Sequence, residues 1–149
     1  MKLSENQNYI NYINQRVNLR FAAAVEALTK CLEDFRGDNL TQSFLLKLIA
    51  DAYFHDGKIE KTFEYYSMSE KADAESLQPK LFFAEFLANK LKNYDKAVNK
   101  CDEILRLAKE NPLDETHEDF SSVSRYISKA EELRSFCQQQ IAAQNGGTK

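Results

Sequence analysis

The two histidines are the residues of this chain best suited to acid–base or metal chemistry. His55 lies beside Asp51 and Asp56, and His117 lies among the carboxylates of segment 114–119. Neither spacing matches an oxygen-ligand loop or a zinc site. A surface histidine at a helix end explains the first cluster, and a solvated acidic loop explains the second. The sequence therefore predicts no metal site.

The sequence also lacks the motifs of nucleophilic catalysis and of phosphate binding. Ser121, Ser122 and Ser124 have no base near them in the sequence. The patterns of a P-loop, a dinucleotide fold, a zinc protease or a serine hydrolase do not occur, and the chain's four glycines could not supply most of them. We expect no catalytic residue and no cofactor, so the chain is not predicted to be an enzyme.

The three cysteines, Cys31, Cys101 and Cys137, are odd in number and far apart, and no two form a CxxC pair. A disulfide framework or a zinc site is not expected from such spacing, and each cysteine falls on an apolar helix face. We expect buried thiols. The first residues lack an apolar run of signal-peptide length, and no stretch is long and apolar enough to span a bilayer. These features predict a cytoplasmic protein.

Length and composition predict one all-helical domain. The chain has 149 residues, a net charge of -3 and only two prolines, and its leucines and alanines far outnumber its isoleucines and valines. That balance favours helix over strand. A net negative charge argues against a nucleic-acid binder, which neutralises phosphates with basic residues.

Glycine, proline and capping residues divide the chain into six or seven helices, with turns expected at Gly37, Gly57, Pro79 and about Lys92. Residues 1–36 carry one amphipathic stripe, in one helix or two. Helices are then expected from positions 38–41 to the turn at Gly57, from 58 to 73, from a cap at Ser76, and from 94 to 110 after a cap at Asn93. A capping box at 116–119 begins a C-terminal helix within 113–143, and 144–149 reads as a disordered tail.

Residues 38–112 contain an internal repeat with a shift of about 35 positions. The first register is Leu46, Ile49, Ala50, Tyr53, Gly57, Ile59, Thr62, Tyr66 and Ser69, and the second is Leu81, Ala84, Glu85, Ala88, Lys92, Tyr94, Ala97, Cys101 and Ile104. This pattern resembles the tetratricopeptide repeat, a helix–turn–helix unit of about 34 residues. Glu85, Lys92 and Thr62 depart from it, because small residues or glycine are usual there.

The resemblance implies antiparallel helical hairpins stacked as a short α–α superhelix, whose first helices line a concave surface. In this chain that surface would bind a partner through Phe44, Lys47, Asp51, Phe54, His55, Phe82, Phe86, Asn89 and Lys90. Asp51 stands where some family members use asparagine to hold a carboxylate, and it would repel one. We expect exposed aromatic area around these phenylalanines, and burial of Tyr53, Tyr66, Phe83 and Ala97.

Segment 80–91 is apolar nearly all round, so it must be covered on both sides. Either a partner covers it, or the stripe of the last helix from Val123 to Ile141 folds back and partly fills the groove; the second is favoured.

The leading functional hypothesis is a protein–protein interaction module or adaptor that binds a peptide or helix, without nucleic acid or membrane. The alternatives are a self-assembling structural protein, including a homodimer, and a small acidic chaperone of the tetratricopeptide type.

Overall fold

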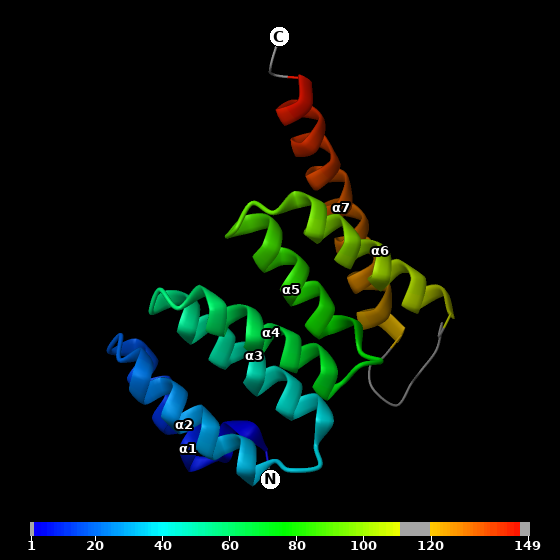
Figure 1. Ribbon diagram of the computed structural model, residues 1–149. Coiled ribbons are helices and arrows are strands. Elements are labelled where there is room, and N and C mark those ends of the chain that lie inside the picture. The colour runs from blue at the N-terminus through cyan, green and yellow to red at the C-terminus, as the bar shows by residue number, and fades with distance from the viewer. Residues whose placement is uncertain (1, 111–119, 147–149) are drawn as a thin grey trace. The chain divides into compact units, whose positions relative to one another are not determined.

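The computed structural model describes residues 2–110 and 120–146, and these residues form helices and the turns between them (Figure 1). A short 3₁₀ turn at Leu3–Glu5 precedes seven α-helices within the described ranges. The all-α prediction is therefore confirmed. The helices are α1 (Gln7–Val17), α2 (Phe21–Asp34), α3 (Asn39–His55), α4 (Ile59–Ala72), α5 (Leu77–Asn89), α6 (Tyr94–Glu110) and α7 (Phe120–Gly146).

The predicted helix ends follow from local capping chemistry. The Asp38 carboxylate accepts a hydrogen bond of 3.1 Å from the backbone N–H of Thr41 at the start of α3. Gly57 ends that helix at a φ of +78°, the left-handed conformation that glycine adopts without strain. At the start of α6, Asn93 accepts a bond of 3.3 Å from the N–H of Lys96. These three boundaries are confirmed.

Three other details differ from the sequence predictions. Ser76 precedes α5, but its side chain makes no capping hydrogen bond. Pro79 lies inside the first turn of α5, where its missing N–H costs nothing, so the turn itself comes earlier. We expected the last helix to end before Gln144, whereas α7 continues to Gly146. The capping box at 116–119 and the cluster around His117 lie outside the described residues.

The helices form two compact units, Met1–Ala74 and Glu75–Lys149. In the first unit each helix packs on the next, from α1 to α4. The stripe of residues 1–36 is divided between two helices, because the chain turns at Leu19, whose φ is +58°. Leu28, Cys31, Leu45 and Ile49 are fully buried at the centre of this unit.

Small side chains bring α3 and α4 close together. The Ser43 hydroxyl donates a hydrogen bond of 2.7 Å to the Ser69 carbonyl, and the Ser69 hydroxyl donates one of 2.7 Å to the Ser43 carbonyl. Thr62 is also fully buried, and its hydroxyl donates to the Lys58 carbonyl. The buried hydroxyls are thus satisfied, as a close helix crossing requires.

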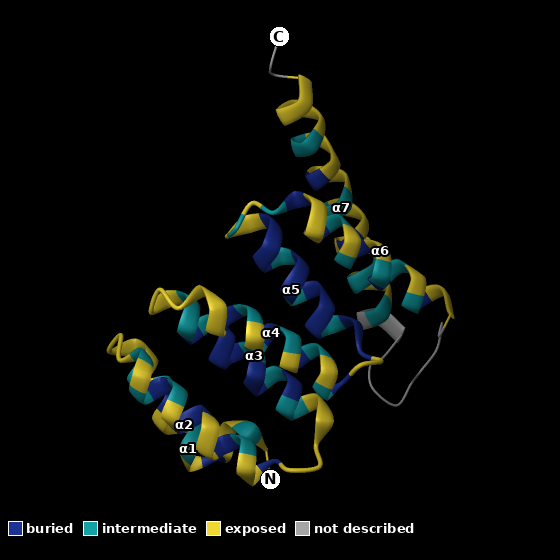
Figure 2. Ribbon diagram, viewed as in Figure 1, coloured by how far each residue is buried: buried dark blue, intermediate teal, exposed yellow. Residues whose placement is uncertain are grey.

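In the second unit, α6 packs on α5 and on α7, and α7 also contacts α5. Figure 2 shows α5 as a nearly continuous buried helix; nine of its 13 residues are buried. Phe83 and Ala97 are buried as expected, and so is Tyr66 of the first unit. Tyr53 is only partly buried: it lies near the end of α3, and its ring packs on Tyr65 with centroids 5.3 Å apart.

Candidate functional site

Five of the predicted partner-binding residues lie on α3 of the first unit. Phe44 and Phe54 are partly buried, and Phe44 packs against the core of this unit. The Lys47 ammonium lies 2.8 Å from the Asp51 carboxylate, which also accepts a hydrogen bond from the Tyr66 hydroxyl. The charge of Asp51 is therefore engaged within the unit.

His55 is exposed at the C-terminal end of α3, and its ring stacks on Phe21 of α2 with centroids 5.6 Å apart. The described residues contain no group of three or more side chains that could hold a metal ion. A hollow of about 130 Å³ lies beside this stack, lined in part by Phe21 and Tyr53. Ligand sites usually exceed 300 Å³, so this hollow has room for little more than one side chain.

The other four predicted residues lie on or next to α5 of the second unit. Phe86 is only 5% exposed and Phe82 is partly buried, whereas Asn89 and Lys90 are exposed. The expectation of exposed aromatic area at Phe86 is wrong. A helix that is apolar nearly all round buries its aromatic residues rather than presenting them to solvent.

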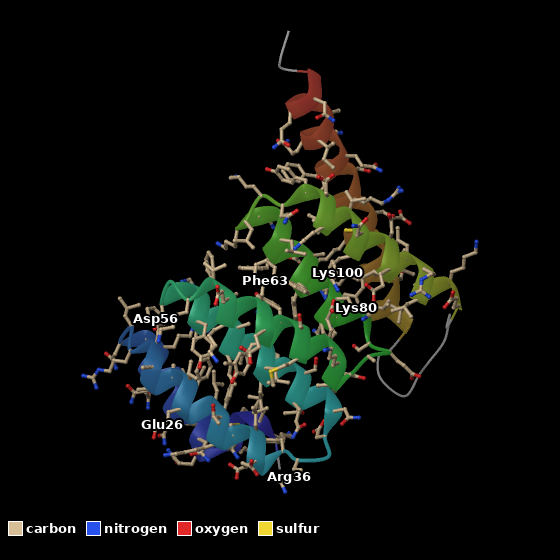
Figure 3. All side chains as sticks on the ribbon, in the orientation of Figure 1. Glu26, Arg36, Asp56, Phe63, Lys80 and Lys100 are labelled. Carbon is tan, nitrogen blue, oxygen red and sulfur yellow. The ribbon has the colours of Figure 1, made fainter. Side chains whose placement is uncertain are left out.

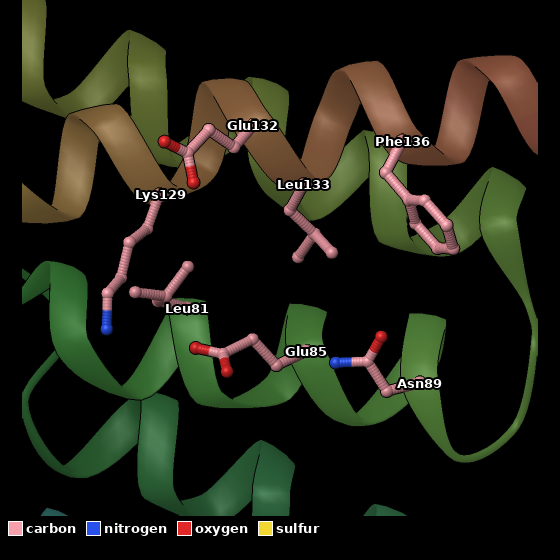
Figure 4. Close-up of a pocket in the computed structure, with 7 residues that line it drawn as sticks. All are labelled: Leu81, Glu85, Asn89, Lys129, Glu132, Leu133 and Phe136. Atoms are coloured by element: carbon pink, nitrogen blue, oxygen red, sulfur yellow. The ribbon is translucent and has the colours of Figure 1, made fainter.

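A larger groove lies between α5 and α7, with a volume of about 340 Å³ (Figure 4). Each helix contributes one row of side chains, because residues three and four positions apart share a helix face. The α5 row has a spacing of four, and in Figure 4 the two rows face each other. The lining residues are Leu81, Glu85 and Asn89 from α5, and Lys129, Glu132, Leu133 and Phe136 from α7.

The α5 side of this groove contains a departure from the repeat pattern. Glu85 stands where the tetratricopeptide pattern has a small residue, and its side chain lines the groove. A small residue there would let the next helix close onto α5. A glutamate is too long and too polar to be enclosed between two helices, so α7 leaves space along this row.

The α7 side of the groove is held from behind by contacts to α6. Ala130 and Cys137 are fully buried, and the Arg134 guanidinium donates a bond of 2.6 Å to Asp102 of α6. These contacts fix the rotation of α7. Leu133 and Phe136 consequently point toward the groove, as Figure 4 shows, and Phe136 remains 41% exposed.

The groove combines an apolar floor with charged rims. Leu81 is buried at its base, and Leu133 and Phe136 form its apolar wall. The exposed side chains of Lys129 and Glu132 make no ion pair with any described residue. Apolar surface beside available charges is the usual composition of a peptide-binding groove.

A buried ion pair joins α5 to α6 in the same unit. The Lys80 ammonium, whose side chain is 7% exposed, lies 3.2 Å from the Glu103 carboxylate, and the Lys100 ammonium lies 3.7 Å from the same carboxylate. Figure 3 labels both lysines. Burial alone would raise the pKa of Glu103, but the two ammonium groups hold that pKa below its usual value. The pair thus stabilises the fold above the unfolded-state pKa, and this stabilisation is lost as the pH falls through the folded-state pKa.

We expect Glu103→Ala to lower the free energy of unfolding by about 3 kcal/mol at pH 7, because it leaves the Lys80 ammonium buried without its partner. The control, Lys80→Met, removes the buried charge itself and should lose less than half as much. Urea unfolding at pH 7 and pH 3 measures both variants. Two results would contradict this account of the pair. One is an equal loss of unfolding free energy in both variants, and the other is a loss in Glu103→Ala that is as large at pH 3 as at pH 7.

No protein-family model, curated protein or solved structure shows a significant match to this chain. Within the described ranges, the helices are too short or too polar for any of them to cross a bilayer.

The sequence led us to one of the seven groove residues, Asn89, as a partner-binding residue. Leu133 was placed in the apolar stripe of the last helix, and Glu132 was interpreted as a carboxylate that faces water. Lys129 and Phe136 were not considered as site residues. Phe136 carries a signal that could have found the site. It is a large aromatic residue next to the stripe, so a helix buried along that stripe must leave it near the surface.

Proposed function

We propose that this chain is a protein–protein interaction module that binds a short peptide or helix in the groove between α5 and α7. The observation that carries the proposal is the groove itself: about 340 Å³, with an apolar floor and the exposed side chains of Lys129 and Glu132 at its rim. Apolar patches of this kind on folded chains often mark interaction sites.

The lining indicates the chemistry of the partner. Leu81, Leu133 and Phe136 offer contact to apolar side chains, and the two glutamates outnumber the single lysine. A partner with two or three apolar residues and a neighbouring arginine or lysine fits both features, since a guanidinium pairs well with a carboxylate.

The pairing of helices supports a solenoid similar to tetratricopeptide repeats. Thr62 and Tyr66 of the first register are buried, and so are their counterparts Ala97 and Cys101 in the second. Ala50 is also buried, whereas its counterpart Glu85 is only partly buried. Lys92 occupies the turn position at a φ of +54°, where the family pattern has glycine. In this proposal the partner binds in the α5–α7 groove, and not on the concave surface that the first helices of each repeat line in the tetratricopeptide family.

The proposal is tested by selecting a phage-displayed library of random 16-residue peptides on the wild-type chain, with Leu133→Glu as the counter-target. Leu133 is partly exposed, so the added carboxylate changes the groove wall without entering the core. We expect enriched peptides to combine apolar residues with arginine or lysine, and to bind the variant at least tenfold more weakly. Enriched peptides that bind both proteins equally, or no enrichment at all, would reject the groove as the binding site.

A further inference from the structure

Two of the three cysteines lie on neighbouring helices of the second unit. Cys101 is on α6 and Cys137 is on α7, and both are free thiols with no exposed surface. The two helices pack on each other (Figure 1). Two thiols within one helix contact can form a disulfide if their positions oppose each other, so the register of α6 on α7 decides what this pair can do.

Contacts at both ends of the α6–α7 pair show that the helices are antiparallel. The ring of Tyr94, the first residue of α6, packs on Phe136 in the second half of α7, with centroids 6.1 Å apart. Ile104 and Ala108, in the second half of α6, share one buried cluster with Ala130 in the first half of α7. The residue numbers of α7 therefore rise where those of α6 fall.

This register brings the two thiols to the same level. Seven residues are close to two helical turns, about 10 Å along the axis, and they return to nearly the same helix face. Cys101 is seven residues before Ala108 on α6. Cys137 is seven residues after Ala130 on α7, so both cysteines are displaced equally and in the same direction from the shared cluster. Cys101 and Cys137 therefore oppose each other across the contact.

Further observations support this placement. The Arg134 guanidinium of α7 donates a bond of 2.6 Å to the Asp102 carboxylate of α6. Asp102 directly follows Cys101, and Arg134 lies one turn before Cys137. Cys137 also adds to the raised pKa of the Cys101 thiol, an effect that only a nearby group exerts. The buried residue one turn before Cys101 is the small Ala97, so the backbones can approach to the Cα separation below about 7 Å that a disulfide needs.

We propose that Cys101 and Cys137 are a modification site: they form a reversible disulfide between α6 and α7 by exchange with a low-molecular-weight disulfide, the chemical class of glutathione disulfide. Neither cysteine lines the α5–α7 groove, so this inference is independent of what the groove binds.

The exchange consists of two substitutions at sulfur. The Cys137 thiolate attacks the small disulfide, so a mixed disulfide forms and the first small thiolate leaves. The Cys101 thiolate then attacks the Cys137 sulfur, so the Cys101–Cys137 bond forms and the second small thiolate leaves. The two cysteines together lose two electrons and two protons, and the small disulfide takes up both and becomes two thiols. An excess of the small thiol reverses both steps.

Cys137 makes the first attack because of its place on α7. Burial raises the pKa of both thiols, so the closed helix pair holds them protonated and unreactive. Residues 142–146, which follow in α7, are all exposed and contribute little packing. The helix therefore opens from this end, which releases Cys137 while the contact at Ala130 persists. Once formed, the disulfide holds α7 on α6 at the end where it opens.

Refolding in a glutathione redox buffer tests the inference on the full chain. The reduced chain is diluted from urea into the buffer, equilibrated at pH 8, treated with iodoacetamide to block the remaining thiols, and cut with trypsin. Each cysteine then lies in its own peptide, which covers residues 31–36, 101–106 or 135–149. We expect mass spectrometry to find the second and third peptides linked, from chains that run as monomers on a non-reducing denaturing gel.

The same exchange in concentrated urea gives the reference, because an unfolded chain links its cysteines according to loop length. Loop closure favours Cys101–Cys137 over Cys31–Cys101 by only about threefold. Folding should raise that ratio by about tenfold or more, because the native contact selects one pair. A folded ratio no higher than the ratio in urea overturns the inference, and so do cysteines that stay thiols or carry only glutathione.

Stability supplies a second readout with a matched control. The oxidised wild type should have a higher urea midpoint than the reduced wild type, since the disulfide restricts the unfolded chain. Cys137→Ala should abolish this difference, whereas Cys31→Ala, which also removes a fully buried thiol, should retain it. An oxidised midpoint at or below the reduced one, or a difference that persists in Cys137→Ala, would show that the two thiols do not oppose each other in the native fold.

Discussion

Replacing Phe86 by alanine is expected to lower the free energy of unfolding by about 3–5 kcal/mol, which is the range for deleting a buried phenylalanine ring. Phe86 is 5% exposed, and it lies on a helix whose residues are mostly buried. Deletion of the Phe86 ring therefore leaves a cavity, and the neighbouring side chains fill that cavity only in part. Urea unfolding of the wild type and the variant measures the loss.

Phe82→Ala is the matched control, because it removes the same ring from the same helix at a partly buried position. It should cost less than half as much. Neither residue lines the α5–α7 groove, so the folded fraction of both variants should bind a groove peptide as the wild type does. Weaker peptide binding by Phe86→Ala with unchanged stability would mean that Phe86 belongs to an open binding face, as the sequence suggested.

The buried thiol of Cys101 is expected to react with a disulfide reagent about 10³-fold more slowly in the folded chain than in the unfolded chain at pH 8. Burial raises its pKa to about 12, with the nearby Cys137 adding to the effect. Only the thiolate reacts, and a pKa three units higher lowers its population by about 10³. Timed labelling in buffer and in urea, with the modified residue identified by mass spectrometry, gives the ratio.

The same raised pKa makes stability depend on alkaline pH. The stabilisation is complete below the ordinary pKa of a thiol, which the unfolded chain is expected to have, and is lost as the pH rises toward 12. We expect a loss of about 1.4 kcal/mol per pH unit for Cys101 within that window. Cys31, whose pKa burial raises to about 11, behaves in the same way. In Cys101→Ala the loss between pH 9 and pH 10.5 should be smaller than in the wild type; an identical loss would contradict the assignment.

Local chemical signals in the sequence were enough to place most helices. Asp38, Gly57 and Asn93 mark their boundaries through capping bonds or left-handed φ, and both depend only on residues a few positions away. The break after α1 could not be predicted in this way. Its left-handed position holds Leu19 rather than glycine, and the only signal nearby was the asparagines at 14 and 18, which are poor helix formers. One helix and two helices therefore both remained open.

The candidate site was less predictable, because it depends on how α7 rotates against α5 and α6. The family resemblance directed attention to Phe82 and Phe86, whereas α7 faces the row of α5 that begins at Leu81. Glu85 was noticed as a departure from the repeat, and the groove beside it gives that departure a structural meaning. The rotation of α7 follows from the burial of Ala130 and Cys137, which only tertiary packing decides.

The central claim is that the α5–α7 groove is the recognition surface. It is tested most directly by fluorescence anisotropy, in which the selected peptide with the highest affinity is titrated with three proteins. These are the wild type, Leu133→Glu in the groove, and Phe54→Ala on the α3 face that the sequence favoured. We predict at least tenfold weaker binding by Leu133→Glu and an affinity within about twofold of the wild type for Phe54→Ala. Unchanged affinity for Leu133→Glu together with a loss for Phe54→Ala would contradict the groove and return the binding site to α3.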